Sequence, residues 1–310
     1  MRKVELLDAS GPELVRSDED ERVLRVRDVQ TYVLASPRWA VPNLAPRGHL
    51  SLLYGAAGSG KSTLYQEAVA ANALGRPFME LLPFEEPQRF LIFDWENGPD
   101  MFSRTLHRLG LREGVQAEDN FVYYFERPGV GLGTSDGRRA VRFQAMRHEA
   151  TCVVFDALLD AFRGIPPTDE DAIGEAMQET KAIAVDLNVA LLVVAHSPKA
   201  AYEDSLHMLK GNAAWGQKAD QAFWLHHKKK SELRSLEHTK ARAMSKRGAL
   251  TVQLIEEGDP DVGPIHVVGS TSTTAAAVRE AKKGAVDDRV RAYLGAHGPV
   301  RRTKMAVDAG

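Results

Sequence analysis

The sequence contains only one cysteine, Cys152, among 310 residues, so no intramolecular disulfide can form. No apolar run approaches the roughly 20 residues that a membrane-spanning helix needs. The longest aliphatic run extends from Val189 to Ala195. The residues from Met1 to Glu5 lack the apolar core of a secretory signal. These shortages predict a soluble protein of the reducing cytoplasm that has no membrane partner.

The chain also carries little net charge. Its 40 lysine and arginine residues nearly balance 42 aspartate and glutamate residues, which gives a formal charge of −2 at pH 7. This balance excludes a uniformly basic coat for nucleic acid, but it is compatible with a local basic patch or a basic channel. The proportions of hydrophobic residues (44%) and charged residues (26%) are ordinary for a globular protein.

A glycine-rich stretch is the most informative feature that the sequence does contain. From Gly55 to Ser62 it reads G-x-x-x-x-G-K-S, the spacing of a phosphate-binding loop, between an apolar run and a helical pattern. Glycines let successive backbone N–H groups turn toward phosphate oxygens, and the following helix adds its positive dipole end. Lys61 is placed to reach the β- and γ-phosphates, and the Ser62 hydroxyl to ligate Mg²⁺. The predicted nucleotide-binding residues are Gly55, Ala56, Ala57, Gly58, Ser59, Gly60, Lys61, Ser62 and Thr63.

Apolar segments alternate with helical patterns along most of the chain. Expected strands cover residues 50–54, 89–96, 121–125, 151–156 and 189–195, and expected helices cover 62–74, 99–109, 138–149 and 171–188. Near-continuously apolar strands between helices predict an α/β fold, with a mostly parallel sheet and helices on both faces. Residues 233–239 and 249–255 predict late antiparallel strands.

Composition predicts the domain boundaries. We expect a charged lead-in over residues 1–34, the α/β domain over 35–256 and a linker over 257–285, where serine, threonine and glycine accumulate. Residues 286–310 predict a small helical tail. This tail is either a simple helical end or the first part of a winged helix.

Reactive side chains come at the ends of the predicted strands, which is where ligands bind in open parallel sheets. Asp156 ends an apolar run, as does the acid that holds Mg²⁺ through water beside a phosphate-binding loop; a helix cap is the alternative. Glu96 is the predicted base that activates the attacking water, with Asp94 as its rival. His196 is placed to sense the γ-phosphate, unless it is an ordinary surface histidine.

Two pairs of cations accompany the predicted strand at 233–239. Lys240 and Arg242 follow its end, and Lys246 and Arg247 come shortly afterwards. Either pair could contact a phosphate across a subunit boundary, as an arginine finger does. We favour Lys240 and Arg242 because they are nearer the strand end. The alternative is a solvated basic hairpin.

The order of these motifs resembles that of RecA-like ATPases, and most closely the RepA-type hexameric replicative helicases that are related to DnaB. The resemblance covers about residues 35–256. Two departures from the family are Ala195, where a second histidine is common, and a longer segment after Arg242. The motifs that carry the resemblance are residues 39–48, 55–63, 94–96, 153–156, 193–199, 209–215 and 240–242.

The resemblance implies a RecA-like P-loop NTPase core that uses ATP and Mg²⁺. It also implies a homo-oligomeric ring, a hexamer, with single-stranded DNA in its channel, where Lys199 and Lys210 are the candidate contacts. The implied activity is that of a DNA helicase or translocase; the alternative is an ATPase that does not unwind DNA, such as a recombination mediator or helicase loader. The implied roles are phosphate and Mg²⁺ binding for Lys61, Ser62 and Thr63, base for Glu96, Mg²⁺-linked acid for Asp156, γ-phosphate sensor for His196, and action in trans for Lys240 and Arg242.

Overall fold

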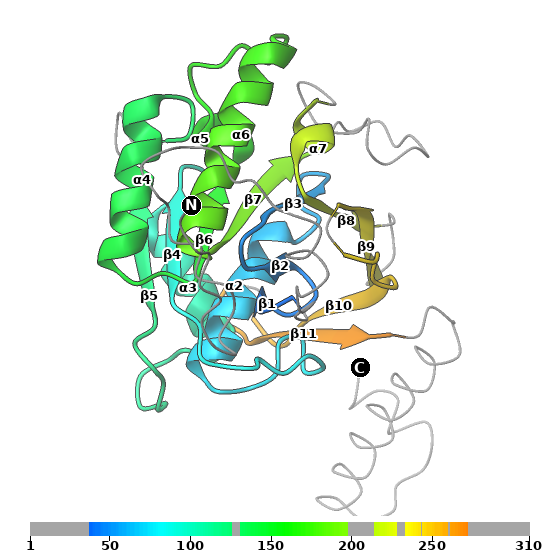
Figure 1. Ribbon diagram of the computed structural model, residues 1–310. Coiled ribbons are helices and arrows are strands. Elements are labelled where there is room, and N and C mark those ends of the chain that lie inside the picture. Colours follow the sequence, from blue (N-terminus) through cyan, green and yellow to red (C-terminus); the bar gives the residue numbers. More distant parts are fainter. Residues whose placement is uncertain are drawn as a thin grey trace, which may run out of the picture. The chain divides into compact units, whose positions relative to one another are not determined.

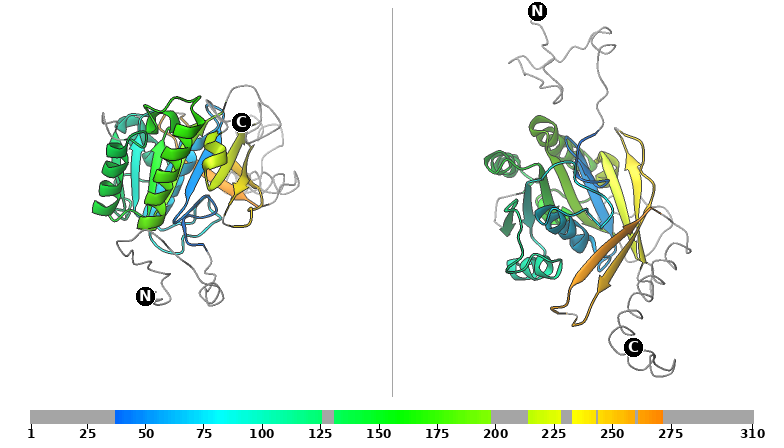
Figure 2. Two further views of the ribbon diagram at one scale, coloured as in Figure 1. Left: turned by 45° about the horizontal axis from the view of Figure 1, so that its top comes forward. Right: turned by 90° about the horizontal axis from the view of Figure 1, so that it is seen from below.

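A computed structural model describes residues 37–125, 131–197, 214–227, 233–242, 244–259 and 261–271. These residues form a nine-stranded sheet with helices on both faces, together with a small hairpin of β1 (Trp39–Val41) and β2 (Ala45–Pro46) (Figures 1 and 2). This arrangement confirms the predicted α/β class. The predicted lead-in, the helical tail and the segment with Lys199 and Lys210 lie outside the described residues.

Six neighbouring strands of the sheet are parallel. Their register pairs Gly55 with His196 and Asp94 with Asp156, so the residues predicted at strand ends reach the same edge of the sheet. In spatial order the six strands are β8 (Gln221–His227), β3 (Leu50–Gly55), β7 (Ala190–His196), β6 (Cys152–Asp156), β4 (Phe90–Asp94) and β5 (Phe121–Phe125).

The sheet continues beyond β8 as three antiparallel strands, β9 (Leu233–Ala241), β10 (Leu250–Glu256) and β11 (Ile265–Ser270). The late antiparallel strands are therefore confirmed. The predicted linker 257–285 is wrong over Ile265–Ser270, because this segment pairs with β10 along its whole length. Ile265 and Val267 are buried, which explains why these residues add to the sheet. β8 was not predicted either.

Helices cover the sheet through two separate apolar clusters. α2 (Lys61–Ala73) and α3 (Pro99–Arg108) pack on one face. α4 (Ser135–Arg147), α5 (Leu158–Ala161), α6 (Glu170–Leu187) and α7 (Ala214–Lys218) pack on the other.

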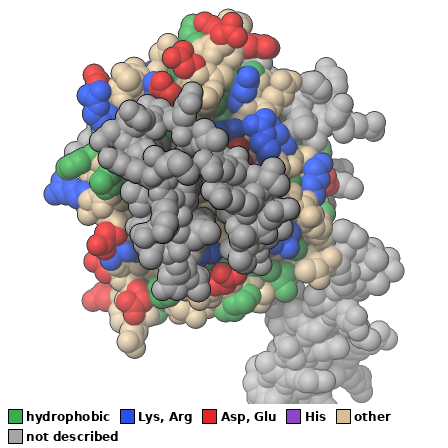
Figure 3. Space-filling view, in the orientation of Figure 1, with side chains coloured by type: hydrophobic (Ala, Val, Ile, Leu, Met, Phe, Trp, Pro, Cys, Tyr) green, Lys and Arg blue, Asp and Glu red, His purple; other side chains and the backbone are tan. Residues whose placement is uncertain are grey.

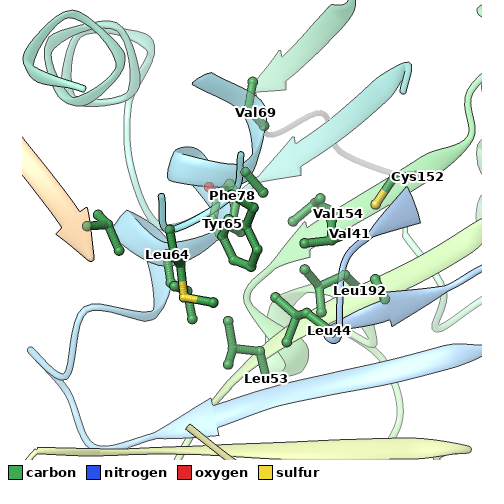
Figure 4. Packing of buried hydrophobic residues seen from close by; sticks show 14 of the residues in the cluster. Val41, Leu44, Leu53, Leu64, Tyr65, Val69, Phe78, Cys152, Val154 and Leu192 are labelled. Atoms are coloured by element: carbon green, nitrogen blue, oxygen red, sulfur yellow. The ribbon is translucent and has the colours of Figure 1, made fainter. Parts of the chain in front are cut away.

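Alternation along the strands divides their side chains between the two clusters. Leu53 packs in the first cluster and its neighbour Leu52 in the second. Figure 4 shows Leu53 beside Leu64 and Tyr65 of α2. The central strands β3, β4, β6 and β7 are buried on both faces, so they hold the carboxyl edge of the sheet and the loops that leave it in fixed positions.

Cys152 lies within this core and is fully buried. Burial raises the pKa of its thiol to about 12, so the side chain packs as a small apolar group. Among the described helices, none combines the length and the apolar character that crossing a bilayer requires.

Candidate functional site

The glycine-rich stretch forms a tight turn between β3 and α2, as its motif predicts. Gly60 caps α2 in the left-handed region, with φ of 93°, where residues with a side chain are strained. A Cβ atom on Gly55 would lie 2.4 Å from the carbonyl oxygen of Leu225 in β8, so only glycine fits at this position. The turn therefore presents backbone N–H groups and the start of α2 at the carboxyl edge of the sheet.

The Lys61 ammonium lies inside this turn. Its Nζ atom donates to the carbonyl oxygens of Gly55 at 3.1 Å and Ala56 at 3.0 Å, and it lies 3.4 Å from Nδ1 of His196. Burial lowers the pKa of Lys61, whereas Asp156 and Glu96 act in the opposite direction. A cation held in the hollow of a glycine-rich turn is suited to binding the terminal phosphates of a nucleotide.

Ser62 and Asp156 are in direct contact, as a shared Mg²⁺ site requires. The Ser62 hydroxyl donates to Oδ2 of Asp156 at 2.8 Å. The other carboxylate oxygen, Oδ1, is buried and accepts no hydrogen bond within the described part of the chain. A hydroxyl beside an unpartnered carboxylate oxygen fits Mg²⁺, which binds one or two protein oxygens together with phosphate and water.

The same carboxylate is unusual in its protonation. Burial raises the pKa of Asp156 to about 7, and the neighbouring Asp94 adds to the rise. Between pH 3.8 and about 7 the folded chain keeps a proton that the unfolded chain loses, so the free energy of unfolding falls as pH rises through this window.

We therefore expect the nucleotide-free protein to lose stability from pH 4 to pH 7, and Asp156→Asn to remove part of the loss, at most about 4 kcal/mol. Urea unfolding at several pH values measures this difference. Identical pH slopes for the wild type and the variant would contradict it.

Two carboxylates follow β4, and they have different surroundings. Oδ1 of Asp94 accepts the backbone N–H groups of Glu96 and Asn97 at 2.9 and 2.8 Å, and Oδ2 accepts the Tyr123 hydroxyl at 3.2 Å. Asp94 is 1% exposed, whereas the Glu96 side chain is 42% exposed. Asp94 therefore holds the turn, and Glu96 is the carboxylate that the turn presents to the site.

His196 connects Glu96 to Lys61. Its Nε2 atom lies 2.9 Å from Oε1 and 3.0 Å from Oε2 of Glu96, while Nδ1 faces the Lys61 ammonium. A neutral imidazole that is protonated at Nε2 donates to the carboxylate and accepts from the lysine. The structure thus brings together the loop, Asp156, Glu96 and His196, each at the end of its strand.

Lys240 and Arg242 lie at a distance from the phosphate-binding loop of their own chain. β9 runs antiparallel to β8, so its end reaches the edge opposite the phosphate-binding loop. The N–H group of Arg242 donates to Asp220, whose own N–H group bonds Leu50 at the start of β3. Lys240 and Arg242, at the end of β9, therefore lie away from Asp156, Glu96 and His196 of the same chain.

The surroundings of Lys240 and Arg242 also differ from each other. Lys240 lies within β9 and donates to the carbonyl oxygens of Gly216 and Gln217 at the end of α7; its pKa falls to about 8 through burial and the nearby cations Arg242 and Lys181. Arg242 is exposed and lines a pocket with basic residues and the acidic residues of α6. Figure 3 shows Lys and Arg side chains gathered on this face, toward the upper right.

Of the rival pair, Arg247 contacts its own chain. The guanidinium of Arg247 lies 5.3 Å from the ring centroid of Trp39, and its backbone N–H group donates to His238. Lys246 is exposed. The packing of Arg247 on β1 favours Arg242 as the cation available to another molecule.

Two contacts in the site were not expected. The Tyr123 hydroxyl supports Asp94, and Arg234 in β9 donates from Nε to the carbonyl oxygen of Ser59 at 2.8 Å. Both residues lie in expected strands without a motif. These two contacts follow from which strands pair with one another. The motifs do not contain that information.

A family model described as "AAA domain" matches residues 15–202, which is more than half of the chain. The match includes the phosphate-binding loop, Glu96, Asp156 and His196. No curated protein shows a significant match to the chain.

Proposed function

The chain belongs to the AAA domain family of P-loop ATPases, and from that premise we propose a ring-forming, ATP-driven motor on single-stranded DNA, a helicase or translocase. The observation that carries the ATPase part is the hydrogen-bonded series Lys61–His196–Glu96 beside the Ser62–Asp156 pair. The series joins Lys61, a cation suited to binding phosphate, to the accessible carboxylate of Glu96. DNA as the substrate of the motor rests on the resemblance of the motifs to RepA-type helicases.

Each residue of the site has a role in hydrolysis. Lys61 and the loop N–H groups bind the phosphates of ATP and offset the charge that develops on them. Ser62 and Asp156 would hold Mg²⁺, which neutralises phosphate charge when it is bound. Glu96 orients the attacking water and takes its proton, and His196 holds Glu96 in place and contacts the γ-phosphate.

The position of Arg242 supports a ring. It lies at the opposite edge of the sheet from its own phosphate-binding loop, so it could reach a phosphate only in a neighbouring subunit. A head-to-tail interface of this kind uses two different surfaces and closes into a ring when the rotation fits. We propose a hexamer, as in the family that the motifs resemble.

Replacing Lys61 by alanine tests the ATPase part. We expect at least about a 100-fold loss of ATP turnover, because the buried ammonium that pairs with the phosphates is gone. Steady-state ATPase assays with single-stranded DNA measure this loss. The control Arg139→Ala removes an exposed cation from α4 and should leave turnover unchanged. Wild-type turnover in Lys61→Ala would exclude the proposed site.

Mass measurement with ATP, Mg²⁺ and single-stranded DNA, followed by strand displacement on the same sample, tests the motor. A ring that hydrolyses ATP faster with DNA and separates strands would support the helicase. Stimulated hydrolysis without strand separation would favour a recombination mediator or helicase loader. A fully active monomer that ignores DNA would exclude both proposals.

A further inference from the structure

We propose that Arg234 is a positioning residue for the phosphate-binding loop, and that it orients the peptide between Ser59 and Gly60 toward the nucleotide. The inference rests on the proposed binding of ATP at this loop. It assigns a task to a strand that lies outside the six-stranded parallel part of the sheet.

Arg234 reaches the loop because β9 is antiparallel. It lies near the start of β9, opposite His227 in β8 and Val252 in β10, so it is at the edge from which the loop leaves β3. Its Nε–H group donates to the carbonyl oxygen of Ser59 at 2.8 Å. A guanidinium donor makes this a charge-assisted hydrogen bond, which is stronger than a neutral one.

The loop rests directly on these antiparallel strands. A Cβ atom added to Gly60 would lie 2.7 Å from Cδ1 of Leu254 in β10 and 3.4 Å from Nε of Arg234. Arg234 is also near Glu256, which in turn lies 3.3 Å from Arg108 of α3. The antiparallel strands thus place both Leu254 and the Arg234 guanidinium against the outer side of the loop.

Peptide geometry converts this contact into a phosphate-binding function. The C=O and N–H groups of a trans peptide point in opposite directions. When Arg234 holds the Ser59 carbonyl outward, the N–H group of Gly60 points to the inner side of the loop. Gly60 is the N-cap of α2, so this N–H group belongs to the donors at the helix start that bind phosphate.

The experiment compares Arg234→Ala with Arg142→Ala, which removes a half-buried arginine that pairs with Asp186 on the α4–α6 side. In Arg234→Ala we expect the Kd for ATP and for ADP to rise about 10- to 100-fold, and the KM for ATP to rise with kcat nearly unchanged. Arg142→Ala should bind both nucleotides as the wild type does. Equilibrium titration and steady-state kinetics on the full chain measure these constants.

Thermal unfolding separates positioning from simple stabilisation. We expect the rise in Tm on adding ATP to shrink in Arg234→Ala, because ligand stabilisation depends on Kd, and to keep its full size in Arg142→Ala. Arg234→Lys, which keeps a charged donor, should bind with intermediate affinity and replaces Arg234→Ala if that variant fails to fold.

The experiment distinguishes failure of the proposed ATP binding from failure of the positioning role of Arg234. If the wild type and Arg142→Ala bind no ATP, the proposed function is wrong. If both bind ATP and the Arg234 variants bind it within about twofold of the wild type, the positioning role alone is excluded.

Discussion

Replacing Glu96 by glutamine should leave ATP binding nearly intact and lower kcat by about 10²- to 10⁴-fold, the range for loss of a general base. Glutamine has the same shape and can still accept the hydrogen bond of His196, so the turn after β4 and the phosphate-binding loop keep their geometry. It cannot take a proton from water. Rapid mixing that follows ATP binding and hydrolysis separately measures both effects.

Asp94→Asn is the matched control, because it also removes one negative charge at the end of β4. The amide oxygen of asparagine can still accept the N–H groups of Glu96 and Asn97, which Asp94 accepts in the structure. We therefore expect less than about a tenfold loss of kcat. If Asp94→Asn stops hydrolysis and Glu96→Gln does not, Asp94 rather than Glu96 is the base.

The part of the site that the sequence predicts is the part built from parallel strands. In a parallel sheet all carboxyl ends meet at one edge, so a residue known to end a strand is also placed in space. Gly55, Asp94, Asp156 and His196 end four such strands, and the register joins them in two pairs. The motifs, and the rule that parallel strands share their carboxyl edge, were sufficient to place these four residues, because both can be applied from the order of the sequence alone.

The antiparallel strands could not be placed in this way. Residues 233–239 were predicted as an antiparallel strand, but the sequence does not say which strand they pair with. The distance of Lys240 and Arg242 from the loop of their own chain, and the contact of Arg234 with that loop, were therefore not predicted. β11 was interpreted as linker because it lies among serine, threonine and glycine. Its apolar signal is short: Ile265, Val267 and Val268. That Ile265 and Val267 are buried becomes clear only from the rest of the sheet.

Mixing two inactive variants should restore ATPase activity if Arg242 acts on a neighbouring subunit. Arg242→Ala alone should lower kcat by about 10³- to 10⁵-fold, the range for removal of an arginine finger, and Lys61→Ala alone should also be inactive. In a mixed ring, a site is complete when one subunit supplies Lys61 and its neighbour supplies Arg242. Random equal mixing then gives roughly a quarter of the wild-type rate.

Arg242 is the better choice than Lys240 for this experiment. Lys240 donates to two carbonyl oxygens at the end of α7, so its replacement also removes a contact within the subunit. The Arg242 side chain is exposed, and its backbone N–H group bonds Asp220 whatever the side chain is. Loss of activity in Arg242→Ala is therefore attributable to the guanidinium.

The matched control mixes Lys61→Ala with Glu96→Gln. Both residues belong to the same half of the site, since His196 connects them within one chain. Every site in that mixture lacks either Lys61 or Glu96, so we expect no recovery of ATPase activity. If mass measurement shows mixed assemblies and the mixture of Lys61→Ala with Arg242→Ala also stays inactive, Arg242 does not act across the boundary. The proposal of a shared site would then have to be abandoned.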